Sequence, residues 1–91
     1  MPSYLIETYL PRSRSGELPA VVDRLRHATD SLAAEGAPVR HLRSTFLPGD
    51  ELCLHLFEAE SAATVEEASR RAAIEPARVV QAYTHAPGGA T

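Results

Sequence analysis

Residues 39–59 read VRHLRSTFLPGDELCLHLFEA and carry the strongest structural signal in the chain. Two runs rich in apolar and β-branched side chains, at 39–47 and 51–59, flank the sequence Pro-Gly-Asp. Proline presets the backbone for a turn, while glycine and aspartate accept the left-handed conformations that tight turns use. We therefore expect two antiparallel strands joined as a hairpin by a short loop.

The pattern of the hairpin also predicts which side chains share a face of the sheet. Pairing Leu42 with Leu56 keeps apolar residues together, whereas sliding the strands by one residue would set Leu42 against His55. The same register gives two further pairs, Ser44 with Leu54 and Phe46 with Leu52. We expect the leucines of the second strand to face the helices: Leu52, Leu54 and Leu56. The face without helices then receives His41, Arg43, Thr45, Cys53, His55 and Phe57.

The segments on either side of the hairpin predict two helices and two more strands. Residues 4–10 read YLIETYL and form a strand that ends at Pro11. Apolar residues recur every three or four positions over 18–32, which is typical of an amphipathic helix. Residues 61–74 predict a second helix, and 78–85, read RVVQAYTH, predict the last strand.

The resulting order is βαββαβ, which predicts an α+β fold of the ferredoxin-like type. We expect one domain over residues 1–86 and a flexible tail over 87–91. Both helices should pack on one face of a four-stranded antiparallel sheet with strand order 4-1-3-2. The other face would then be free to pair with a second copy, as in dimeric α/β barrels.

Alternation along the first and last strands completes the face without helices. In the first strand, Tyr4, Ile6, Thr8 and Leu10 are expected in the core and Leu5, Glu7 and Tyr9 outside it. In the last strand, Val80 and Ala82 are expected inside and Val79, Gln81, Tyr83 and His85 outside. An uncovered sheet face with this many apolar and aromatic side chains predicts a homodimer.

Composition excludes several classes of function. The 91 residues carry a formal charge of -3, so the positive excess that nucleic-acid binding requires is absent. One cysteine cannot form a disulfide within the chain, and no apolar run reaches the roughly 20 residues of a membrane span. We expect a cytoplasmic protein that is neither exported nor inserted in a membrane. No phosphate-binding loop or dinucleotide fingerprint is present, so no nucleotide or organic cofactor is expected.

Three segments resemble a known family: YLIETYLP at 4–11, HLRSTFLPGDELCLHLFEAES at 41–61, and RVVQAY at 78–83. Together they are similar to the small actinobacterial nickel-binding ferredoxin-like proteins. The resemblance implies a ferredoxin-like homodimer that holds a transition metal on histidines. The chain departs from the family at Arg43, where a histidine is common, and at His55, where a cysteine is common.

The first functional hypothesis is a nickel or zinc site. Neutral imidazole is a common ligand for both metals, and His41 and His55 lie diagonally across the expected hairpin. Cys53 and His85 are possible further ligands from the same expected face.

The second hypothesis is a metal-free enzyme of small molecules on the same face. Glu7 would orient His55 as the acid–base group and raise its pKa. Tyr9 and Arg43 would stabilise negative charge that develops on a substrate. A third alternative is a non-catalytic interaction or stress protein.

Overall fold

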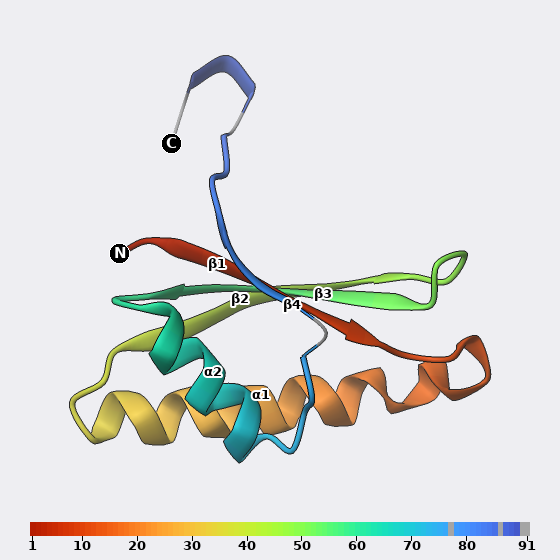
Figure 1. Cartoon of the computed structure of the whole chain (residues 1–91), viewed down its shortest axis with the longest axis horizontal. Coiled ribbons are helices and arrows are strands. Elements are labelled where there is room, and N and C mark those ends of the chain that lie inside the picture. Colours follow the sequence, from red (N-terminus) through yellow and green to blue (C-terminus); the bar gives the residue numbers. More distant parts are fainter. Residues whose placement is uncertain (77, 86, 90–91) are drawn as a thin grey trace.

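The computed structural model describes residues 1–76, 78–85 and 87–89, and its elements follow the predicted βαββαβ order (Figure 1). The strands are β1 (Ser3–Tyr9), β2 (Val39–Leu47), β3 (Leu52–Ala59) and β4 (Arg78–Ala82). The helices are α1 (Leu18–Ala34) and α2 (Ala62–Arg71), with short 3₁₀ helices η1 (Arg12–Glu17) and η2 (Pro87–Gly89). Within the described residues, no helix is both long and apolar enough to cross a membrane.

The four strands form one antiparallel sheet in the order β2-β3-β1-β4, with β1 and β3 at its centre. Both α1 and α2 cover the same side of this sheet (Figure 1). The predicted ferredoxin-like α+β fold and its strand order are therefore confirmed. The opposite side, which carries no helix, is the helix-free face.

Turn and capping chemistry explains where the helices begin and end. Pro19 lies in the first turn of α1, where its missing N–H removes no helical hydrogen bond. Gly36, two residues beyond α1, has φ 91°, a left-handed conformation that glycine adopts without strain. The Ser61 side chain accepts a hydrogen bond from the Thr64 N–H at 3.4 Å at the start of α2. Ala73, just beyond α2, has φ 58° without being a glycine.

The core lies between the sheet and the two helices. Ile6, Leu25, Phe57 and Val65 are each 0% exposed and belong to one apolar cluster. The inner side of α2 otherwise carries small residues such as Ala68, so this helix can approach the sheet closely.

β2 and β3 pair in two registers that are separated by a bulge at Leu42. Before the bulge His41 pairs with Phe57, and after it Leu56 pairs with Arg43. The predicted pairing of Leu56 with Leu42 is therefore wrong, as are the two pairs predicted farther along the hairpin. The extra residue in β2, Leu42, is 38% exposed. It shifts the register of the later residues, and the alternation of apolar and polar residues does not predict this shift.

In β3, the row of side chains that faces the helices is the row that was predicted to face away from them. Cys53, His55 and Phe57 are 2%, 0% and 0% exposed. They pair with Thr8, Ile6 and Tyr4 of β1. These three residues of β1 were predicted to face the core, and that prediction is confirmed. Both rows of β3 are largely apolar, so alternation separates the rows without showing which one meets the helices.

β4 shows the same inversion. Val79 pairs with Ile6 and packs against the core, whereas Val80 pairs with Leu5 on the helix-free face. The predicted faces of this strand are therefore wrong by one residue. The cause is the same, because two adjacent valines fit either face.

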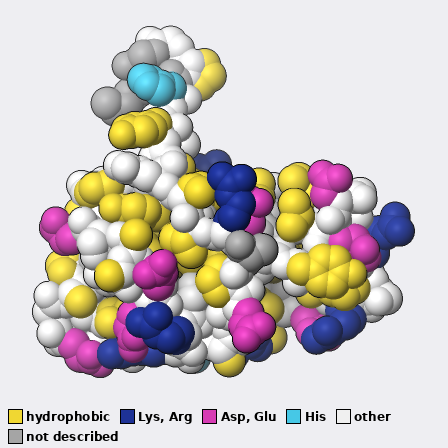
Figure 2. Space-filling view, in the orientation of Figure 1, with side chains coloured by type: hydrophobic (Ala, Val, Ile, Leu, Met, Phe, Trp, Pro, Cys, Tyr) yellow, Lys and Arg dark blue, Asp and Glu magenta, His cyan; other side chains and the backbone are white. Residues whose placement is uncertain are grey.

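Beyond β4 the chain leaves the sheet on its helix-free side and stands clear of the rest of the molecule (Figures 1 and 2). The strand ends at Ala82, so Tyr83 and His85, which were predicted to belong to it, lie beyond its end. Tyr83 is 83% exposed and His85 is also exposed. Of the flexible tail predicted over 87–91, residues 87–89 form η2 and the last two lie outside the described residues, as does residue 86.

The helix-free face thus has a different composition from the predicted one. Its middle is aliphatic and its margins are charged. The central side chains are Leu5, Leu52, Leu54, Leu56 and Val80. The charged side chains around them are Glu7, Arg40, Arg43, Glu58 and Arg78.

Candidate functional site

Four polar side chains form a continuous hydrogen-bonded chain between the sheet and α1. The hydroxyl of Ser44 lies 2.9 Å from Nε2 of His41 and 2.6 Å from Nδ1 of His55. On the far side of His55, Nε2 lies 3.1 Å from the hydroxyl of Thr8. These four residues, Thr8, His55, Ser44 and His41, are called the polar chain.

Three strands and one bulge assemble the polar chain. Thr8 comes from β1 and His55 from β3, while β2 supplies both Ser44 and His41. Residues three apart in a regular strand lie on opposite faces. The bulge at Leu42 inserts one extra residue between His41 and Ser44, and it thereby brings both side chains to the helix-covered face.

Burial keeps the central imidazole uncharged. His55 is 0% exposed, and loss of hydration, aided by the nearby His41 ring, lowers its pKa from 6.5 to about 4. Both ring nitrogens have hydroxyl partners, so the neutral ring donates from one and accepts at the other. No hydrogen-bond partner is missing for any buried side-chain nitrogen or oxygen in the described part of the chain.

His41 is less deeply placed. It is half-buried, and its ring centroid lies 6.1 Å from that of His55 and 5.1 Å from that of Phe57. Burial lowers the pKa of His41, while a hydrogen bond to the backbone of Arg43 raises it. A bond that favours the charged ring is one in which a ring N–H donates to a carbonyl oxygen.

A cavity opens at each end of the polar chain. The α1–β2 cavity, of about 410 Å³, is lined by His41 and Ser44 and, from α1, by Val22, Arg26, Thr29 and Asp30. A second cavity, also of about 410 Å³, is lined by Thr8 and Cys53 together with residues of η1, α1 and the segment after α2. We call it the Thr8–Cys53 cavity. The polar chain therefore crosses the core from one cavity to the other.

Cys53 adds a thiol at the second cavity. Burial raises the pKa of this thiol, and a hydrogen bond with the Thr8 hydroxyl partly opposes the rise. The side chain is therefore a protonated thiol at neutral pH.

The residues predicted for an enzyme do not come together. His55 pairs with Ile6, and the next residue, Glu7, projects from the opposite side of the sheet. Glu7 instead lies 3.7 Å from the guanidinium of Arg78. The predicted orientation of His55 by Glu7 is wrong, because adjacent residues of a strand face opposite ways.

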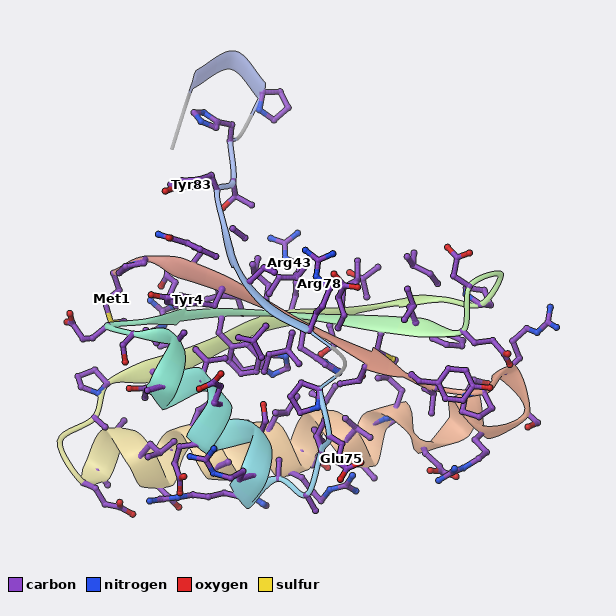
Figure 3. All side chains as sticks on the ribbon, in the orientation of Figure 1. Met1, Tyr4, Arg43, Glu75, Arg78 and Tyr83 are labelled. Carbon is purple, nitrogen blue, oxygen red and sulfur yellow. The ribbon has the colours of Figure 1, made fainter. Side chains whose placement is uncertain are left out.

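The other two predicted catalytic residues also lie away from His55. Arg43 points away from the helices on the helix-free face, on the same side as Arg78 (Figure 3). Tyr9 is 64% exposed, and its hydroxyl donates to Glu51 at 3.4 Å. Of the predicted catalytic set, only His55 belongs to the polar chain.

The predicted metal ligands are brought together only in part. His41 and His55 share a face and converge on Ser44, as a two-histidine site requires, but that face is the helix-covered one. Cys53 lies at the opposite end of the polar chain, and His85 lies on the segment that leaves the sheet. Across residues 1–76, 78–85 and 87–89, no three His, Cys, Asp or Glu side chains are grouped as metal ligands.

Ser44 and Thr8 were not predicted as site residues. A signal for both exists in the sequence, since each is a polar residue in a row of a strand that was assigned to the core. Buried hydroxyl groups need hydrogen-bond partners, and a histidine on the neighbouring strand can supply one.

Comparison with known proteins supports the fold and gives no information on function. No family model matches the chain, and no curated protein matches it. The crystal structure of SCO4226 from Streptomyces coelicolor A3(2) is similar, with a TM-score of 0.69 and 16% sequence identity. The similarity covers 92% of this chain and 99% of that one, and it supports the ferredoxin-like arrangement over the part of the chain that it covers.

Proposed function

We propose that the chain binds a small polar molecule in the α1–β2 cavity and exchanges a proton with it at His41 and Ser44. The observation that carries this proposal is the position of the Ser44 hydroxyl, within hydrogen-bond distance of two imidazoles at the wall of the cavity. A hydroxyl between two imidazoles can give up a proton on one side and receive one on the other.

The electrostatics of the cavity favour this chemistry. Both imidazoles are neutral at pH 7 because burial lowers their pKa values, so each keeps a lone pair that can accept a proton. The cavity also carries one charge of each sign from α1, on Arg26 and Asp30. These two side chains are suited to hold a ligand that has both donor and acceptor groups.

A fragment titration followed by NMR of ¹⁵N-labelled histidines tests the proposal. Small ketones, phenols and carboxylic acids are added one at a time, and the signals of His41 are monitored. At least one class should shift these signals, and Val22→Phe, which narrows the cavity, should abolish the shift. Val21→Phe is the matched control, because Val21 lines the Thr8–Cys53 cavity instead. Shifts that survive Val22→Phe, or none with any class, would contradict the proposal.

A second candidate function is the binding of nickel or zinc by His41 and His55. It is favoured by the convergence of Nε2 of His41 and Nδ1 of His55 on one hydroxyl, and by the resemblance to nickel-binding proteins. Calorimetry with each metal should then show binding that is lost in His41→Gln and kept in His27→Gln. His27 is an exposed histidine of α1 and provides the matched control. Because burial lowers the pKa of both imidazoles, affinity should change little near pH 6.5 and fall only at lower pH, where these rings are protonated.

We also propose that two copies pair through the helix-free face. Its central leucines and valine form one apolar surface across β3, β1 and β4, including Leu54, Leu5 and Val80. The charged margin holds both signs, with Arg40 3.4 Å from Glu58 in addition to the pair between Glu7 and Arg78. A two-fold axis would set such a margin against its own complement.

A further inference from the structure

We infer that the Thr8–Cys53 cavity is a second binding site, which takes a small carboxylic acid with an apolar body and holds its carboxylate on Arg24. The inference goes beyond the proposed function, because it concerns the other cavity and needs no ligand at His41 or Ser44. It rests on the way in which burial, apolar side chains and charges are distributed over the wall of this cavity.

The interior of the Thr8–Cys53 cavity suits an apolar group. Leu10 from the end of β1, Val21 from α1 and Ile74 from the segment after α2 contribute aliphatic side chains to its wall. The buried residues at its floor are Thr8 and Cys53, and the Thr8 hydroxyl already has a hydrogen-bond partner in the polar chain. The volume of about 410 Å³ lies in the range that small-molecule pockets occupy. An apolar body would therefore enter first and leave a polar group at the entrance.

The charged residues of this cavity are all exposed, so they surround its entrance: Arg14, Glu17, Arg24 and Glu75. Two of them neutralise each other. The guanidinium of Arg14 donates to both carboxylate oxygens of Glu17, at 2.7 and 2.8 Å. This hydrogen bond lowers the pKa of Glu17, and the charge of Arg24 also contributes to lowering it. Arg14 is therefore occupied, and Arg24 lies close enough to attract a carboxylate at the entrance.

Arg24 is the guanidinium that remains for a ligand. Its Nε donates to the carbonyl oxygen of Ala72 at 2.8 Å, which fixes the group beside the segment that lines the cavity. The N–H groups of its two terminal nitrogens are not used by this bond. None of the ion pairs between described residues includes Arg24. A guanidinium fixed in this way can bind both oxygens of a carboxylate in parallel.

Glu75 is the group at the entrance that opposes an anion. It lies on the segment after α2 and takes part in no ion pair among the described residues (Figure 3). Its charge repels a carboxylate, so the contacts of the apolar body with the wall must offset this repulsion. Removal of the charge in Glu75→Gln should therefore strengthen binding.

An NMR titration of the ¹⁵N-labelled protein with three related compounds tests the inference. Phenylacetate, 2-phenylethanol and phenethylamine share a benzene ring and differ in charge. Phenylacetate should shift the amide signals of Val21 and Ile74, and the other two should bind at least about tenfold more weakly, because hydrogen bonds to a charged group are the stronger ones. Equal affinity for phenylacetate and the alcohol, or no effect of phenylacetate on these signals, would overturn the inference.

Two arginine variants identify the group that holds the carboxylate. Arg24→Gln removes the charge but keeps an N–H donor for Ala72, and it should lower the affinity for phenylacetate at least about tenfold. Arg70→Gln is the matched control, because Arg70 is an exposed arginine of α2 that lines neither cavity. Unchanged affinity in Arg24→Gln, an equal loss in Arg70→Gln, or weaker binding in Glu75→Gln would overturn the assignment. The comparison of the three compounds decides the matter if Arg24→Gln does not fold.

One further variant separates this site from the α1–β2 cavity. Val21→Phe narrows the Thr8–Cys53 cavity and should abolish the phenylacetate shift at Ile74. Phenylacetate shifts at Ile74 that survive Val21→Phe would contradict binding in this cavity. Ligands of the α1–β2 cavity are followed at His41 instead, so failure of one proposal is distinguishable from failure of the other.

Discussion

Acidification should destabilise the protein through His55 before most carboxylates are protonated. In the folded state burial holds the pKa of this imidazole at about 4, whereas an unfolded chain exposes it at about 6.5. The folded pKa is therefore the lower of the two. Above about pH 6.5 both states are neutral and the group contributes no pH dependence; between these values only the unfolded state takes up the proton.

The size of the effect follows from the gap between the two pKa values. A gap of about 2.5 pH units, at about 1.4 kcal/mol per unit, corresponds to a loss of about 3–4 kcal/mol in the free energy of unfolding. The loss accumulates as the pH falls from about 6.5 to about 4 and then levels off. It is a large share of the stability of a small domain, which is typically about 5–15 kcal/mol.

Urea denaturation at a series of pH values measures the loss, and His55→Gln isolates it. Glutamine does not titrate and can keep a hydrogen bond to a neighbouring hydroxyl. The wild type should lose about 3 kcal/mol more than the variant between about pH 6.5 and about pH 4. The exposed carboxylates Glu17, Glu35 and Glu67, whose pKa values are lowered by arginine hydrogen bonds, affect both proteins alike. Parallel curves for the two proteins across this range would refute the burial argument.

Three further predictions concern the fold and its surface. In urea denaturation, Phe57→Ala should lower the free energy of unfolding by about 3–5 kcal/mol and Leu42→Ala by less than about 1 kcal/mol, because Phe57 is 0% and Leu42 38% exposed. Equal losses in the two variants would contradict the bulged register. Ala73→Gly should raise stability by about 0.5–1 kcal/mol, because φ 58° strains alanine but not glycine, and an unchanged or lower melting temperature would count against this explanation. In sedimentation at micromolar concentration the wild type should be a dimer and Leu54→Arg a monomer, with the dimer retained in Ala34→Arg on exposed α1; a monomeric wild type would exclude the helix-free interface.

The secondary structure and strand order could be predicted because local chemistry and periodicity agree along most of the chain. The Pro-Gly-Asp turn indicated the hairpin, and the spacing of apolar residues indicated α1. Which face of the sheet each side chain occupies was harder to predict from the sequence. β1 mixes polar and apolar residues, so its inward row of Tyr4, Ile6 and Thr8 could be assigned correctly. β3 and β4 are apolar on both sides, and the choice of face depends on packing with the helices.

Half of the candidate site could be predicted from the sequence. His41 and His55 were correctly expected on one face, but through a register that the structure corrects. The bulge at Leu42 changes the face of every later residue in β2, and it moves Arg43 away from the histidines while it brings Ser44 to them. No rule of strand alternation contains this shift. The true partners of His55 are therefore a consequence of tertiary pairing.

The most direct test of the polar chain is a neutron crystal structure of the deuterated protein at about pH 7.5, where both imidazoles are neutral. It should show a single deuteron on the His55 ring, because the ring is neutral and both of its nitrogens have hydroxyl partners. The Ser44 hydroxyl should lie within hydrogen-bond reach of Nε2 of His41 and Nδ1 of His55. A doubly deuterated His55, or a Ser44 hydroxyl out of hydrogen-bond reach of either imidazole, would contradict the account.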